Sequence, residues 1–339
     1  MNDMFLKLNF SEVIASVHSK LVGLDEITRE TLNFDEKGMF AINIVLAFVM
    51  FGVALGIRPA TFKDVFTKPK SIIVGLCSQW FVLPAMTFLL VIALSSVIPP
   101  MVAMGMLLVA ACPGGNISNF MSQFSKGNTE LSVSMTGIST LFSTLMTPFN
   151  FAFWGGLYVR YISKHTTDAV PVLNIPFYDI MVTVFLLLGV PLIIGLLFAK
   201  FLPKITEKLK KPMQYFSLLF FVVMVVLAFR NNFDLFLERI HIIFVLVLLH
   251  NGLALLSGFT MGTAFKLPAA DRRSLTIETG IQNSGLGLVL LFNTNIFPKD
   301  LIIGGMLFVT AWWGIWHIIS GLSLATYWSK KPLKEIGRK

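Results

Sequence analysis

The 339-residue sequence is 55% hydrophobic and only 13% charged, and its mean hydropathy is +0.77. This composition lies far from that of a water-soluble domain and excludes a soluble enzyme. The net charge of +9 does not indicate a nucleic-acid partner, because the basic residues fall between long apolar segments. We expect an all-α integral membrane protein that crosses the lipid bilayer several times.

Residues 1–38 form a polar segment at the start of the sequence. Apolar residues recur at helical spacing between Leu6 and Leu24, while Lys7 and Glu12 fall on other faces. This pattern predicts an interfacial amphipathic helix rather than a membrane span. The acidic residues that follow argue against a cleaved signal or a transit peptide.

Nine apolar segments follow, each long enough to cross a hydrocarbon core of about 30 Å as a helix. The predicted spans are 39–57, 71–97, 101–125, 130–158, 179–199, 213–230, 241–263, 274–296 and 301–328. We expect residues 39–328 to form one transmembrane domain and residues 329–339 a basic cytoplasmic tail.

The basic residues predict the orientation of these spans. If the spans alternate in direction, about two thirds of the 27 Lys and Arg residues fall on one side of the membrane. The positive-inside rule makes that side cytoplasmic, which places the N-terminus outside and the C-terminus in the cytoplasm. We expect a plasma-membrane protein, or an inner-membrane protein in a bacterium.

Two of the spans contain residues that should interrupt a helix. In the third span, Pro113 removes a backbone donor and is followed by two glycines, Gly114 and Gly115. The eighth span has a polar midpoint, "ETGIQNSGLG" (278–287). Unwound backbone at membrane depth is tolerated only where protein or a water-filled cavity satisfies its polar groups. Spans one to four begin outside the membrane and spans six to nine begin inside, and in each set the third span is the interrupted one. This pattern predicts inverted-topology repeats whose broken helices meet at a central site.

The carboxylate of Glu278 in the eighth span needs a partner, because inserting a carboxylate at the middle of the membrane costs at least about 2.5–3.5 kcal/mol. No Lys or Arg lies in the interior of any predicted span, so a proton or a bound cation is expected instead. The polar side chains expected to converge on it supply neutral oxygens. They are Gln79, Ser118, Asn119, Ser132, Thr136 and Gln282. One carboxylate among neutral oxygens suits a sodium ion. Considered alone, Gln79 or Thr136 is more typical of a residue that forms hydrogen bonds between helices than of an ion ligand.

Other polar groups in the spans have simpler interpretations. Glu130 begins the fourth span, where an acidic residue commonly stabilises the first turn of a helix. His250 and His317 lack a second ligand at helical spacing, so we expect them to be packed or hydrogen-bonded rather than metal-bound. Cys77 and Cys112 match neither a disulfide framework nor a metal site.

Five motifs resemble, in order and spacing, those of the bile acid:sodium symporter family. They are "CPGGNISN" (112–119), "KGNTELSVSMT" (126–136), "LLHNGLALLSGF" (248–259), "TIETGIQNSG" (276–285) and "WHIISG" (316–321). The similarity covers nearly all of residues 39–328. The sequence departs from the family at two places. Asn116 and Ile117 occupy positions where the family commonly has two smaller residues. The polar N-terminal segment takes the place of the first span of the ten-span bacterial members.

The resemblance implies a division of the transmembrane domain and two sodium sites. The core domain, with two crossing discontinuous helices, would comprise 71–158 and 241–328, and the panel domain 39–57 and 179–230. One sodium ion would bind Ser118, Asn119, Ser132, Thr136 and Glu278. The other would bind Gln79, Glu278, Gln282 and the backbone carbonyls of Thr279 and Ile281. Residues near the substrate would be Asn116, Ile117, Asn283 and Ser284.

The function implied is sodium-coupled symport of an organic anion, either a bile-acid-like amphipath or a small carboxylate, by alternating access. We expect the anion to meet no buried Lys or Arg, so that half-helix N-termini and the sodium ions offset its charge. Beyond this substrate and the lipid bilayer, no nucleic acid and no obligate protein partner are expected.

Three alternatives remain open at the level of the sequence. A proton-coupled carrier would titrate Glu278 itself. A non-transporting sensor would share the fold and bind a ligand without moving it. An intramembrane enzyme would use Glu278 with His250 or His317, although the sequence shows no nucleophile motif or metal triad.

Overall fold

The computed structural model describes residues 36–56, 69–165, 181–182, 184–230, 233–293, 296–297 and 301–333. Within these ranges the chain is helical apart from turns and isolated β-bridge residues, and one such bridge joins Gly114 to Gln282. The predicted all-α character is therefore confirmed for the described part of the chain. The predicted interfacial helix and the last residues of the basic tail lie outside it.

Helical segments of the described residues coincide with every predicted span. The long helices are α2 (Glu36–Gly56), α8 (Thr129–His165), α11 (Pro203–Arg230), α12 (Phe233–Ala264) and α15 (Gly304–Ser329). In the second span, α4 (Pro69–Cys77) continues through a π-helical turn at Ser78–Val82 into α5 (Leu83–Ala93). A second π-helical turn, Phe185–Gly189, leads into α10 (Val190–Phe201) in the fifth span.

The helices extend beyond several predicted spans. Helix α11 begins at Pro203 rather than at 213, α12 begins at Phe233 rather than at 241, and α8 continues to His165 rather than ending at 158. Hydropathy detects only the apolar part of a helix, whereas charged first and last turns can remain helical outside the hydrocarbon core. These differences matter for α11, whose first turns carry several lysines.

Three helical stretches of the described residues are both long and apolar enough to cross a membrane: Pro69–Ala93, Ile240–Ala264 and Gly304–Ser329. Helix α8 is not among them, and polar side chains are buried along much of its length. The chain thus has the helices of a membrane protein, while the number of crossings and the inverted repeats stay predictions.

Both expected interruptions are present. Helix α6 (Pro100–Ala111) ends before Cys112, whose backbone is extended, and α7 (Ile117–Phe124) begins after Asn116. In the eighth span, α13 (Ala269–Gly280) is separated from α14 (Ser284–Leu291) by a short non-helical segment. Each interrupted span therefore consists of two half-helices.

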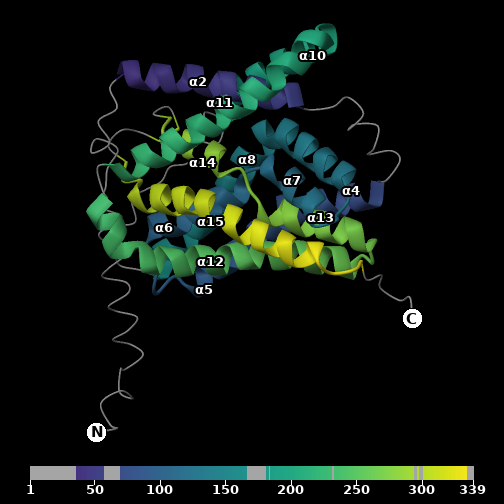
Figure 1. Cartoon of the computed structure of the whole chain (residues 1–339). Helices are drawn as coiled ribbons and strands as arrows, with labels where there is room; N and C mark the ends of the chain where they lie inside the picture. The colour runs from purple at the N-terminus through teal and green to yellow at the C-terminus, as the bar shows by residue number, and fades with distance from the viewer. Residues whose placement is uncertain are drawn as a thin grey trace.

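The helices pack in two groups. Helices α2, α10 and α11 contact one another along one side of the molecule, at the top of Figure 1. The larger group includes α6, α8, α12, α13 and α15, and its apolar core contains Met101, Leu107, Phe308 and Trp313. The division of these groups into a panel domain and a core domain stays a prediction.

Close packing of α6 on α15 gives the first testable prediction. A Cβ atom on Gly105 would lie 2.7 Å from the backbone Cα of Met306, which cannot move aside as a side chain could. We expect Gly105→Ala to lower the free energy of unfolding by about 1–3 kcal/mol through overpacking. Thermal unfolding of the purified protein in detergent measures this change.

The matched control is Gly252→Ala in α12. A Cβ atom at Gly252 meets no atom within 4 Å, so the substitution should be neutral or stabilise the helix by up to about 1 kcal/mol. Equal melting temperatures for the two variants would contradict the close approach of α6 to α15.

Candidate functional site

The two interrupted spans cross and are joined through their unwound backbones. The Gly115 N–H donates to the Ile281 carbonyl at 2.8 Å, and the Asn283 N–H donates to the Pro113 carbonyl at 2.8 Å. These bonds flank the antiparallel bridge between Gly114 and Gln282. Backbone groups freed by one break are therefore satisfied by the other, which explains how both breaks persist in an apolar protein interior.

Glu278 lies in the last turn of α13, next to this crossing, and its side chain is 0% exposed. Its carboxylate accepts hydrogen bonds from the hydroxyls of Ser118 in α7 and Ser132 in α8. Thr136 Oγ1 donates to the two carboxylate oxygens at 3.1 and 3.0 Å. The structure thus brings together residues that are more than 140 positions apart in the sequence.

Asn119 completes this cluster through its side-chain oxygen. Asn119 Oδ1 lies 3.0 Å from Ser132 Oγ and 3.2 Å from Thr136 Oγ1. All five residues expected at the first sodium ion therefore surround one point between α7, α8 and α13.

The chemistry of this cluster fits a hard monovalent cation. No hydrogen bond or ion pair joins Glu278 to a Lys or Arg of the described residues, and the surrounding ligand atoms are neutral oxygens. The described part of the chain also contains no group of three or more His, Cys, Asp or Glu side chains that could hold a metal. Sodium accepts such a set of oxygens, whereas zinc and similar metals prefer nitrogen and sulfur ligands.

The residues expected at the second sodium ion also lie at the crossing. Gln79 Nε2 donates to the Glu278 backbone carbonyl at 2.8 Å, and Gln282 Nε2 donates to the Thr279 carbonyl at 2.7 Å. The side-chain oxygens of both glutamines are buried and have no hydrogen-bond partner among the described residues. A buried oxygen without a partner is costly, and a bound cation would satisfy both. The Ile281 carbonyl differs, since it already accepts the Gly115 N–H.

Gly114 allows Gln79 and Glu278 to meet. A Cβ atom on Gly114 would lie 2.8 Å from both Gln79 Nε2 and Glu278 Oε2. The absence of a side chain is thus a steric requirement of the site and not only a cause of the helix break.

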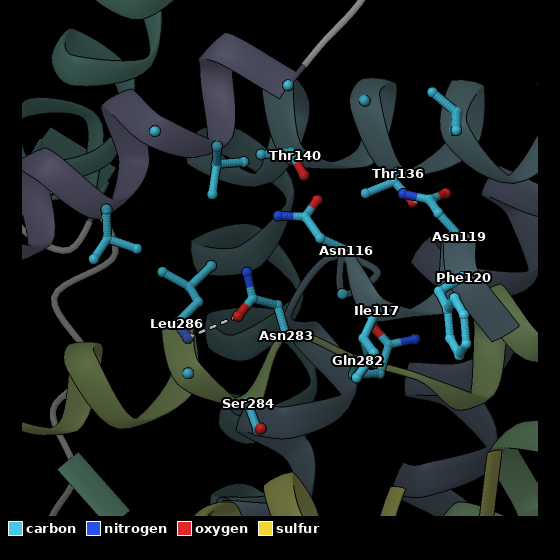
Figure 2. Close-up of a pocket in the computed structure, with 18 of the residues that line it drawn as sticks. Asn116, Ile117, Asn119, Phe120, Thr136, Thr140, Gln282, Asn283, Ser284 and Leu286 are labelled. Carbon is cyan, nitrogen blue, oxygen red and sulfur yellow. Dashed lines mark hydrogen bonds between the residues drawn. The ribbon is translucent and has the colours of Figure 1, made fainter. Parts of the chain in front are cut away.

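A cavity of about 620 Å³ adjoins the crossing. It is bounded by α2 and α11 on one side and by α7, α8, α14 and α15 on the other. The four residues expected near the substrate, Asn116, Ile117, Asn283 and Ser284, all line it. Figure 2 shows the amide groups of Asn116 and Asn283 in this space, with the Asn283 amide directed toward Leu286. Asn283 also caps α14, because its Oδ1 accepts the Leu286 N–H at 3.1 Å.

The cavity lining also includes one half-buried basic side chain, Lys210. The expectation that the anion meets no buried Lys or Arg stays a prediction. The sequence correctly shows no Lys or Arg inside an apolar span, but α11 continues as a helix before its predicted span and places Lys210 beside the cavity.

Two supporting residues were not predicted as part of the site. Asn251 Nδ2 in α12 donates to the carbonyl of Gly280 at 2.7 Å, where α13 ends, and Asn251 Oδ1 accepts from Ser320 at 2.5 Å. Asn251 therefore satisfies a carbonyl that the helix break leaves free. The sequence contains a signal that could have predicted this role, since Asn251 is a polar residue inside an apolar span and belongs to one of the five motifs.

The two histidines differ in their surroundings. His250 is buried, its Nε2 lies 2.8 Å from Thr87 Oγ1, and its ring packs against Trp313 at a centroid distance of 4.6 Å. His317 is nearly buried and lines the cavity. The structure shows no hydrogen bond between either ring and Glu278 among the described residues.

The comparison with known proteins gives consistent results. Residues 43–239 match the family described as the Sodium Bile acid symporter family. The chain is 32% identical over 294 residues to an uncharacterized sodium-dependent transporter, YocS, of Bacillus subtilis, covering 87% of this chain and 84% of that one. It is 28% identical over 287 residues to the hepatic sodium/bile acid cotransporter of Rattus norvegicus, covering 82% and 74%.

A third relative is longer than this chain. The "P3 protein" of Homo sapiens is 30% identical over 269 residues, which are 78% of this chain and 53% of the human protein. The chain thus spans about half the length of that relative.

The helical architecture, the apolar spans and the relatives named transporters define a membrane transporter of a sodium-dependent class rather than an enzyme. The chain belongs to the Sodium Bile acid symporter family.

Proposed function

We propose that the chain is a secondary active transporter that couples sodium to the symport of an organic anion by alternating access. The observation that supports this most directly is that Asn119, Thr136 and Gln282 belong to the polar clusters around Glu278 and also line the cavity. Three of the proposed ion ligands would therefore also lie at the surface that meets the substrate. Ordering these side chains around a cation would prepare the cavity surface for the anion.

Two sodium ions would occupy the clusters described above. The first would bind Ser118, Asn119, Ser132, Thr136 and Glu278. The second would bind Gln79, Glu278, Gln282 and the carbonyl of Thr279, with Ile281 contributing a carbonyl that is already hydrogen-bonded.

The charges explain the coupling. Two sodium ions beside one carboxylate leave a net positive charge at the crossing, where the half-helices α7 and α14 begin. The positive ends of the dipoles of these two half-helices face the same region. An anion then binds strongly only when sodium is present, and by reciprocity the anion raises sodium affinity by the same factor.

The position of the cavity between the two helix groups supports alternating access. Val53 in α2 and Phe220 in α11 line one side, and Val133 in α8 and Leu286 in α14 line the other. Gln123 and Thr129, which flank the turn at Lys126, also line it. Because that turn lies on the predicted cytoplasmic side, this conformation would be open inward, and movement of the α2, α10 and α11 group against the rest would close it.

The cavity suits an amphipathic anion. Its volume lies within the range of about 300–1,000 Å³ that is usual for small-molecule sites. Amides at the crossing would contact the polar part of the substrate, and Ile117, Phe120 and Val289 would contact its apolar part. The name of the rat relative includes a bile acid, and a small carboxylate would meet the same polar groups.

Linked binding of sodium and anion tests this function. In thermal-shift measurements, we expect taurocholate or a short oxo acid to raise the melting temperature more in sodium chloride than in choline chloride. Sodium-driven accumulation of the same anion in proteoliposomes should follow. Anion uptake in choline driven by a pH gradient would instead support a proton-coupled carrier, and binding without flux would support a sensor.

A further inference from the structure

Lys210 in α11 is the only Lys, Arg, Asp or Glu side chain among the described residues that line the cavity. The side chain is half-buried, and no ion pair or hydrogen bond joins it to another described residue. Glu207, one turn earlier in α11, is exposed and does not line the cavity. The cavity wall thus contains a basic group that no carboxylate of the lining neutralises.

The surroundings of Lys210 strengthen its effect on a charged solute. The remaining lining consists of neutral polar and apolar residues, including Val133, Phe220 and Leu286. Walls of low dielectric constant focus the field of a single charge into the enclosed water and raise the local concentration of ions of opposite sign. This field does not depend on bound sodium, whereas the positive charge proposed at the crossing does.

We propose that Lys210 selects anions for the cavity and supplies a charge contact for the carboxylate or sulfonate of the substrate. Lys210 belongs to the group of α2, α10 and α11, whereas Asn116 and Asn283 belong to the crossing in the other group. An anion that contacts Lys210 and the crossing amides together bridges the two groups. The role in transport rests on the function proposed above, but the electrostatic effect does not.

Charged thiol reagents measure this effect without knowledge of the substrate. Val133→Cys places a reporter thiol in the cavity, and it is modified with either the anionic reagent MTSES or the cationic reagent MTSET. The ratio of the two rates reports the local potential. The parent protein, which retains Cys77 and Cys112, gives the background.

With Lys210→Ala, we expect the ratio of MTSES to MTSET rates to fall by about tenfold. Lys210→Arg should preserve the ratio, and so should Lys211→Ala, which removes an exposed neighbouring charge. A reporter outside the cavity, Ser163→Cys, should show no dependence on Lys210. If Val133→Cys does not fold, Thr140→Cys reports on the same cavity.

An unchanged ratio in Lys210→Ala overturns the proposal, and so does an equal fall in Lys211→Ala, which would indicate a diffuse field from the basic cluster. A fall confined to Lys210→Ala supports it. If that fall is observed while sodium-driven uptake is absent, the charge selection stands and the proposed symport fails.

Discussion

Replacing Glu278 with glutamine is expected to abolish sodium-driven accumulation of the anion while leaving the protein folded. Glutamine keeps the size of the side chain: its amide oxygen can still accept hydrogen bonds from Ser118 and Ser132, and its amide N–H can donate to the hydroxyl oxygen of Thr136. It removes the only charge of the cluster that attracts a cation. Loss of one partner of a buried charge pair typically costs about 3–5 kcal/mol, which corresponds to more than about 100-fold in sodium affinity.

The measurement compares sodium-driven uptake into proteoliposomes with the elution and melting behaviour of the same preparations. Glu130→Gln is the control, because Glu130 is an exposed carboxylate in the first turn of α8. That variant should transport at close to the wild-type rate. Wild-type sodium dependence in Glu278→Gln would show that the cation binds elsewhere.

The second large effect is expected from Gly114→Ala. The added methyl group would lie 2.8 Å from both Gln79 Nε2 and Glu278 Oε2, so one or both side chains must move. Such overpacking costs about 1–3 kcal/mol, which lowers sodium affinity by roughly tenfold or more if the strain falls on the site. Sodium-dependent thermal stabilisation of the purified variant gives this affinity.

The neighbouring glycine provides a matched comparison. A Cβ atom on Gly115 would lie no closer than 3.4 Å to any atom, the nearest being the Gln282 carbonyl oxygen. Gly115→Ala should therefore retain sodium affinity within about twofold, since no overpacking arises. Equal losses in the two variants would mean that the crossing as a whole, and not the approach of Gln79 to Glu278, is sensitive to added volume.

The sequence predicts the site well where an isolated residue violates the chemistry of its surroundings. Glu278 in an apolar span and the run of Pro113 and two glycines in another are costly unless they have a function. Those costs correctly identified both helix breaks, whereas the ion-binding role of the residues around Glu278 stays a prediction. The hydroxyls of Ser132 and Thr136 were identifiable because they lie one helical turn apart on the same face of α8.

Other features depend on packing between distant segments and could not be predicted. The π-helical turn at Ser78–Val82 includes Gln79, and Ser78 in it accepts a hydrogen bond from Thr279 at 3.0 Å. No local propensity specifies such a turn. The position of Lys210 beside the cavity depends in the same way on how α11 packs, and hydropathy gives no information on polar first turns.

Equilibrium binding of radioactive sodium to the purified protein tests the central claim most directly. We predict saturable binding to the wild-type protein, loss of that binding in Glu278→Gln, and retention in Glu130→Gln. Saturable binding of equal affinity and stoichiometry in the wild type and in Glu278→Gln would contradict a sodium site at the crossing of the two broken helices.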